Sequence, residues 1–179
     1  MKQKPKKKKP PTDQKIRETL RKKCCTKAKA LARRRDNYRC RFCGIGEPNK
    51  RTHGSHVYSE GVSTAMSADV DNIICLCAEH HMNGRWNASK KDFNWHGSPA
   101  EAMDWFTLNH PDLHQRLKIR SQQKIKPDLR YWQDKLKELQ EMEAQFELGI
   151  KPEPPTPPTT TISFIHGETN KILDETLTT

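Results

Sequence analysis

Two short groups of cysteine and histidine have the residue types and the spacing of a metal site. Cys40 and Cys43 form a Cys-x-x-Cys pair followed by glycine, and Cys77 and His80 repeat the spacing with one imidazole. Structural zinc sites take four thiolate or imidazole ligands in a tetrahedron, commonly as two such pairs. The sequence therefore predicts a structural Zn²⁺ held by Cys40, Cys43, Cys77 and His80. Cys75 is the rival ligand, but its apolar neighbours favour a buried small side chain.

The six cysteines are not expected to form disulfides. They occur as three close pairs, and no apolar segment follows the N-terminal lysines as it would in a secretory signal. A reducing compartment is therefore expected, where such pairs more often bind metal. Cys24 and Cys25 are adjacent in a basic helical segment, so they cannot both face one partner, and they are interpreted as structurally incidental.

Three further polar residues are not needed for zinc, namely His56, Asn72 and His81. Asn72 precedes Cys77 by five residues, Cys77 precedes His80 by three, and His81 follows directly. This register resembles the HNH endonuclease family, which has the ββα-metal fold, and RRRDNYRCRFCG resembles the entry to its zinc-bearing branch. The resemblance covers about residues 33–90. Within the family, CRFCG, GSHVYS, DNIICLC and HHMNGRWN are similar to phage recombination proteins of the NinG type.

The resemblance implies hydrolysis of DNA phosphodiester bonds. His56 would be the general base, because a neutral imidazole can take a proton from water near pH 7. Asn72 would orient His56 or the turn that carries it. His81 would hold a catalytic Mg²⁺ or Mn²⁺, separate from the zinc. Many family members have aspartate before the strand histidine, whereas this chain has Ser55, a poorer ligand for a hard cation. Either His81 and the substrate phosphate hold the ion with waters, or His53, Asp69, Asp71 or Glu79 contributes a ligand, or metal-dependent cleavage has been lost.

Charge is distributed unevenly along the 179 residues. Residues 1–51 carry 20 lysines and arginines against four acidic residues, whereas the remainder carries 13 against 18. A basic first part indicates a polyanionic partner, and DNA is the expected one. Arg41, Arg85, Lys90 and Lys91 flank the proposed cleft and are candidate phosphate contacts. No apolar run approaches the roughly 20 residues that span a bilayer, so no membrane partner is expected.

The pattern of helices and strands along the chain predicts an α+β fold. It consists of a small zinc-stapled ββα-metal core with flanking helices and disordered termini. Thr12 or Asp13 is the expected helix cap, strands are expected near 52–59 and 72–77, and a short helix near 78–86. Prolines begin helices near 99, 111 and 127. The predicted segments are a basic arm at 1–11, a basic helix at 12–35, the core at 36–97, a helical extension at 98–148, and a Pro/Thr-rich linker and tail at 149–179.

Three further possibilities remain open, one each for function, location and assembly. The chain could be a non-catalytic zinc-containing protein that binds nucleic acid or assembles on a degenerate HNH scaffold. The predicted location is the cytoplasm of a bacterial host of the phage, but KPKKKKPP also resembles a nuclear import signal. The apolar stripe of the 127–148 helix is interpreted as core or as a contact with a partner helix, and this helix could pair with a copy of itself in a homodimer.

Overall fold

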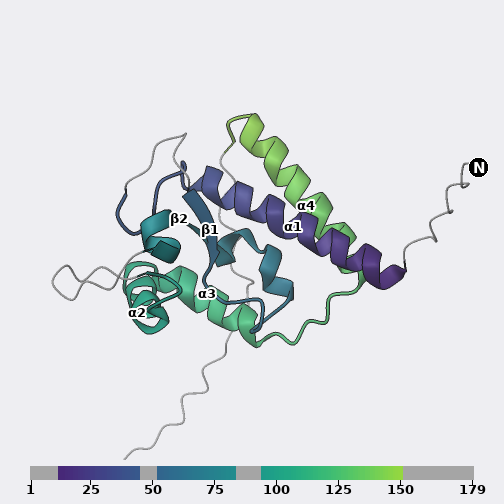
Figure 1. Cartoon of the computed structure of the whole chain (residues 1–179). Helices are drawn as coiled ribbons and strands as arrows, with labels where there is room; N and C mark the ends of the chain where they lie inside the picture. Colours follow the sequence, from purple (N-terminus) through teal and green to yellow (C-terminus); the bar gives the residue numbers. More distant parts are fainter. Residues whose placement is uncertain (1–11, 45–51, 84–93, 151–179) are drawn as a thin grey trace, which may run out of the picture.

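The computed structural model describes residues 12–44, 52–83 and 94–150, and these form an α+β fold around a two-stranded sheet (Figure 1). The predicted α+β class is confirmed. The basic arm at 1–11 and nearly all of the tail predicted for 149–179 lie outside the described residues. The elements, in chain order, are α1 (Asp13–Arg35), β1 (Thr52–His56), the 3₁₀ turns η1 (Ala65–Ala68) and η2 (Val70–Asn72), β2 (Ile73–Cys77), the π-helical turn η3 (Glu79–Asn83), α2 (Pro99–Asn109), α3 (Pro111–Gln122) and α4 (Leu129–Glu147).

The first helix, α1, begins and ends where its local sequence directs. The Thr12 hydroxyl accepts a hydrogen bond from the Lys15 amide at 3.4 Å, so Thr12 is the cap. After Arg35 the chain leaves the helix through Asn37 and Tyr38, both at positive φ. This left-handed exit turns the chain back toward the sheet and delivers the first cysteine pair to it.

β1 and β2 pair antiparallel, with Thr52 opposite Cys77 and His56 opposite Ile73. Alternation along β2 sends Ile73 to one face of the sheet and Ile74 and Leu76 to the other. The Ile73 face packs against α1, the η1–η2 segment and α4. The opposite face packs against α2 and α3, which lie across the sheet from α1 (Figure 1). The two-residue period of β2 thus feeds two separate apolar clusters.

Helix α4 lies along α1, as Figure 1 shows. Its predicted apolar stripe faces inward: Trp132 and Leu139 are buried, and Leu136, Met142 and Phe146 pack around them. The Arg34 guanidinium donates to the Phe146 carbonyl at 2.9 Å and lies over its ring. The stripe is therefore core, and a homodimer through this helix stays a prediction that would need its outward side chains.

The expectation that Cys24 and Cys25 have no structural role is wrong. Both are buried in the cluster between α1, η1 and α4. The Cys24 thiol lies 3.5 Å from the Trp132 carbonyl, and the Cys25 thiol lies 3.3 Å from the Ser67 hydroxyl. They do face two different partners, and burial raises the pKa of both thiols, so they act as small core side chains.

Among the described helices, none combines the length and the apolar character needed to cross a bilayer.

Candidate metal centre and histidine cluster

The four predicted zinc ligands meet at one point beside the end of β2. One ligand atom from each of Cys40, Cys43, Cys77 and His80 lies within 4.8 Å of every other. His80 turns its Nδ1 toward the sulfurs, 3.1 Å from Cys77 Sγ and 3.7 Å from Cys40 Sγ. Three thiolates and one imidazole at these separations could bind a metal such as zinc. The prediction of this Cys/His cluster is confirmed.

The first pair is held in place by a tight turn and by the outer edge of β2. The Gly44 amide donates to the Cys40 carbonyl at 2.8 Å, and Gly44 has φ +69°, a conformation that glycine adopts without strain. The Arg41 amide donates to the Cys75 carbonyl at 2.8 Å. The segment between α1 and the turn therefore lies along β2, which brings Cys40 and Cys43 to the end of that strand.

Asp36 organises this edge, and sequence reasoning missed it. Its carboxylate accepts two hydrogen bonds from Arg35 at 2.9 and 3.0 Å, one from Arg41 at 3.2 Å and one from the Cys75 amide at 3.0 Å. Arg41 also contacts His110 at 3.2 Å. The Arg41 guanidinium, a predicted phosphate contact, thus already contacts Asp36 and His110 in the structure. Asp36 follows three arginines, and no spacing signal sets it apart from other helix-end acids.

Burial favours the protonated form of the Cys77 thiol in the metal-free protein. Burial raises the pKa of Cys77, and it raises the pKa of Cys75 as well. Cys75 is fully buried on the α1 face, as predicted, and stays outside the cluster. Metal binding at Cys77 must release a proton, so affinity for zinc falls as the pH is lowered.

His56 ends β1 with its ring fixed by a main-chain carbonyl. Its Nε2 lies 2.9 Å from the Ser67 carbonyl oxygen, which can only accept, so Nε2 carries the proton and Nδ1 carries the lone pair. Burial lowers the pKa of His56, and the hydrogen bond to Ser67 opposes that shift in part. His56 is therefore neutral near pH 7, with one nitrogen ready to accept a proton.

Asn72 is fully buried and staples the loop between the strands. Its Oδ1 accepts from the Tyr58 amide at 2.8 Å, and its Nδ2 donates to the Tyr58 carbonyl at 2.9 Å and to the Met66 carbonyl at 3.1 Å. The loop that supplies the Ser67 carbonyl to His56 is thus pinned by one amide. Asn72 thus holds the loop that follows His56, and its role in orienting a general base stays a prediction.

His81 lies within a cluster of three histidines. Its Nδ1 is 2.8 Å from His53 Nδ1, and its Nε2 is 3.2 Å from His96 Nε2. His53, left open by the sequence as a possible metal ligand, and His96, expected to have a surface or packing role, both contact the candidate catalytic residue. They lie 28 and 15 residues from His81, so no local motif signals either contact. Burial, with the charges of His96 and His53, lowers the pKa of His81 to about 4.

One tryptophan joins the cysteine cluster to His56. The Trp95 amide donates to the His80 carbonyl at 2.8 Å, and its indole Nε1 donates to the His56 carbonyl at 2.9 Å. Besides burial, Lys29 and His96 lower the pKa of both His56 and His81. The pKa values of both histidines are therefore influenced by the same two side chains, Lys29 and His96. Arg85, Lys90 and Lys91, the other predicted phosphate contacts, lie outside the described residues.

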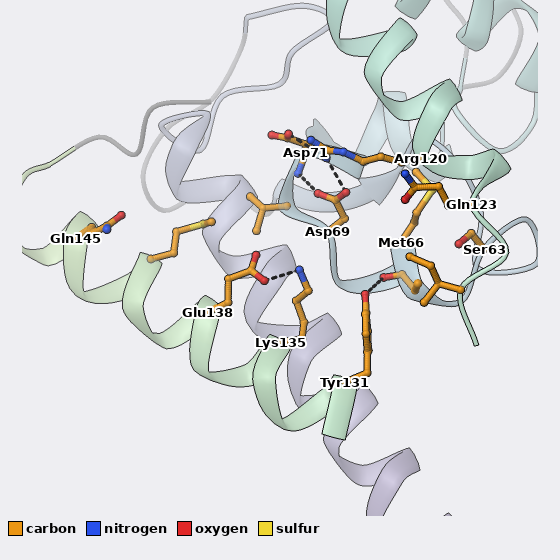
Figure 2. Close-up of a pocket in the computed structure, with 14 residues that line it drawn as sticks. Ser63, Met66, Asp69, Asp71, Arg120, Gln123, Tyr131, Lys135, Glu138 and Gln145 are labelled. Atoms are coloured by element: carbon orange, nitrogen blue, oxygen red, sulfur yellow. Dashed lines mark hydrogen bonds and ion pairs between the residues drawn. The ribbon is translucent and has the colours of Figure 1, made fainter. Parts of the chain in front are cut away.

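A separate hollow of about 430 Å³ lies between α4 and the η1–η2 segment (Figure 2). Its charged side chains are paired: Arg120 contacts Asp69 at 2.8 Å and Asp71 at 3.2 Å, and Lys135 contacts Glu138 at 2.6 Å. The Tyr131 hydroxyl donates to the Ala65 carbonyl at 3.1 Å, and burial raises its pKa to about 12. These contacts brace the far side of the loop that Asn72 pins.

Comparison with known proteins returned no match to any protein-family model, to any curated protein or to any solved structure. The chemistry of the site must therefore be argued from the residues of this chain.

Proposed function

We propose that this protein is a zinc-stapled DNA endonuclease of the HNH type that hydrolyses phosphodiester bonds with the help of a divalent metal ion. The observation that carries the proposal is the state of His56. This imidazole is neutral, has its tautomer set by the Ser67 carbonyl, and is linked through Trp95 to the main chain of His80 in the Cys/His cluster.

Each residue near the candidate catalytic centre has a definite role in this proposal. His56 Nδ1 takes a proton from the attacking water, while Nε2–H stays bonded to Ser67. Asn72 keeps the Ser67 loop in place, and Trp95 holds the His56 carbonyl. His81, neutral because its pKa is low, offers a lone pair to a divalent ion. Such an ion would offset charge on the phosphate as the bond breaks.

The zinc centre serves the fold in this scheme. Cys40, Cys43, Cys77 and His80 would hold a structural ion, and Trp95 connects the His80 main chain to the His56 main chain. A metal crosslink is the expected way to stabilise a two-stranded sheet with so small an apolar core. The proposed setting is phage recombination or DNA processing in a bacterial cytoplasm, with the basic arm at 1–11 adding salt-sensitive DNA contacts.

Ser55 favours a second candidate, a non-catalytic zinc protein that binds nucleic acid. It stands where the HNH pattern often has a metal-binding aspartate. Its hydroxyl is buried and has no hydrogen-bond partner within the described part of the chain. A serine there supplies no carboxylate to an ion, so the scaffold could bind DNA without cutting it.

A plasmid assay separates the two candidates. Zinc-loaded protein is incubated with supercoiled DNA and Mg²⁺ or Mn²⁺, and nicked and linear products are measured beside a gel-shift assay. Wild type is expected to cut, His56→Ala and His81→Ala to lose cutting by at least about 100-fold, and all three to shift DNA. His114→Ala, on α3, is the control and should cut normally. DNA binding without cleavage by wild type would establish the second candidate.

A further inference from the structure

The proposed function names only His81 as a ligand of the divalent ion. The histidine cluster around His81 supplies a second ligand. We propose that a divalent transition-metal ion binds between Nδ1 of His53 and Nδ1 of His81, with His96 as the residue that positions His81. This inference deepens the proposed function, because it names the residues and the class of ion at the same site. It selects His53, three residues before His56, from the residues that the sequence leaves open as a second ligand.

The geometry separates the roles of the two nitrogens of His81. Nδ1 of His81 faces Nδ1 of His53 at 2.8 Å, whereas Nε2 of His81 faces Nε2 of His96 at 3.2 Å. A single ion cannot bind both nitrogens of one imidazole ring. A tetrahedral ion with metal–nitrogen bonds of about 2.0–2.1 Å separates two nitrogens by about 3.3 Å. The His53–His81 pair therefore needs to open by only about 0.5 Å to admit an ion of this size.

Protons can be assigned consistently through the cluster. His81 donates from Nε2–H to the lone pair of His96 Nε2, which leaves Nδ1 of His81 as an acceptor. His53 then donates from Nδ1–H to His81 in the metal-free protein. On metal binding the proton of His53 moves to its Nε2, and both Nδ1 atoms become ligands. A metal-bound histidine usually donates its other ring N–H to a fixed acceptor, which is the place of His96 here.

The surroundings of the pair fix the class of ion. Two imidazoles favour borderline ions such as Co²⁺, Ni²⁺ or Zn²⁺ and also bind the harder Mn²⁺ more weakly, whereas Mg²⁺ prefers oxygen ligands and keeps its water. Ser55 lies on the same face of β1 as His53 by strand alternation, and it brings a hydroxyl in place of a carboxylate. The remaining positions stay open to water and to a phosphate oxygen, as a catalytic ion requires.

Metal titration of the full chain tests the inference without DNA. The protein, free of any affinity tag that contains histidine, is first loaded with one equivalent of zinc at the Cys/His cluster. Ni²⁺ is then titrated by calorimetry. Wild type should bind one further equivalent, and Mg²⁺ should not compete. His53→Asn and His81→Asn should each weaken Ni²⁺ binding at least about 100-fold, and His96→Ala by about 10–100-fold.

Two further arms make the result decisive. His96→Gln should recover much of the affinity, because its amide oxygen can accept from His81 Nε2–H, and His114→Asn should bind as wild type does. In wild type, two-bond ¹H–¹⁵N spectra with a second equivalent of Zn²⁺ should move the Nδ1 signals of His53 and His81. Unshifted rings, coordination through Nε2, or unchanged Ni²⁺ affinity in His53→Asn would overturn the inference.

Cleavage measured in parallel keeps the two proposals distinguishable. If the second ion binds through His53 and His81 but no DNA is cut, the metal site stands and the nuclease proposal fails. If His56-dependent cleavage occurs and His53→Asn both binds Ni²⁺ and cuts like wild type, the nuclease proposal stands and this inference fails.

Discussion

Replacement of Asn72 by alanine should destabilise the protein by about 3 kcal/mol, because three hydrogen bonds of about 1 kcal/mol each are lost. All three bonds, to the Tyr58 amide, the Tyr58 carbonyl and the Met66 carbonyl, lie between 2.8 and 3.1 Å. Asn72 is fully buried, so water cannot replace them without a shift of the loop. Asn72→Asp should be at least as damaging, since it keeps the size but removes the donor to both carbonyls.

Urea unfolding of zinc-saturated protein, followed by circular dichroism, measures the change in free energy. Asn109→Ala is the matched control, because Asn109 is exposed at the end of α2 and makes one hydrogen bond, to the Trp105 carbonyl. It should change stability by less than about 0.5 kcal/mol. A loss below about 1 kcal/mol for Asn72→Ala, or Asn72→Asp close to wild type, would refute the reasoning that hydrogen bonding at this position holds the loop.

Four shorter predictions follow from other contacts. Removing zinc with a strong chelator should abolish the near-ultraviolet signal of the packed tryptophans, and added Zn²⁺ should restore it; a metal-free protein with a native spectrum would contradict the structural role. Gly54→Ala should cost about 1–3 kcal/mol, because its Cβ would lie 3.0 Å from Ile73 Cγ2 and from Lys29 Cβ, whereas Gly61→Ala, with 3.7 Å to the nearest atom, should be neutral in thermal unfolding. Trp95→Phe should lose about 1 kcal/mol and slow cleavage while zinc content stays at one equivalent; unchanged cleavage would show that the bond to the His56 carbonyl is unimportant. Because the pKa of His56 is lowered in the fold, the unfolded chain binds the proton of His56 more tightly than the folded chain does. The contribution of His56 to stability should therefore be complete above about pH 6.5 and should decline as the pH falls toward the folded pKa. His56→Gln should flatten that decline in urea titrations at several pH values.

Sequence periodicity, turn residues and helix-start signals were sufficient to predict the α-helices and the two strands, but not the 3₁₀ turns at Ala65–Ala68 and Val70–Asn72. Thr12 caps α1, Pro99 and Pro111 begin α2 and α3, and the stripe of α4 is buried where its spacing predicts. The Cys/His cluster was predictable for a similar reason, since its spacing is local within each pair and the number of ligands is fixed by the metal. Local rules account for what depends on neighbours along the chain.

What the sequence did not reveal depends on contacts between distant segments. Nothing near Cys24 and Cys25 shows that α4 will cover them, because Trp132 lies 108 residues from Cys24. The same holds for His53 and His96, which reach His81 from β1 and from the turn before α2. Asp36 is similar, because its carboxylate accepts a hydrogen bond from the Cys75 amide of β2, 39 residues away. These pairings are set by how the sheet and helices pack, so spacing alone does not predict them.

The packing of α1 on α4 has a consequence for how the chain is made. Ribosomes synthesise α1 before α4, but the buried face of α1 is covered by Trp132 and Leu139, which emerge about 100 residues later. Until then Leu31 and the neighbouring apolar side chains of α1 stay exposed to water on the nascent chain. Chaperones or other incomplete copies can bind them there. Native structure on this side of the sheet must therefore wait until translation has passed the last described helix, and a premature stop before residue 129 would leave a product that cannot close its core.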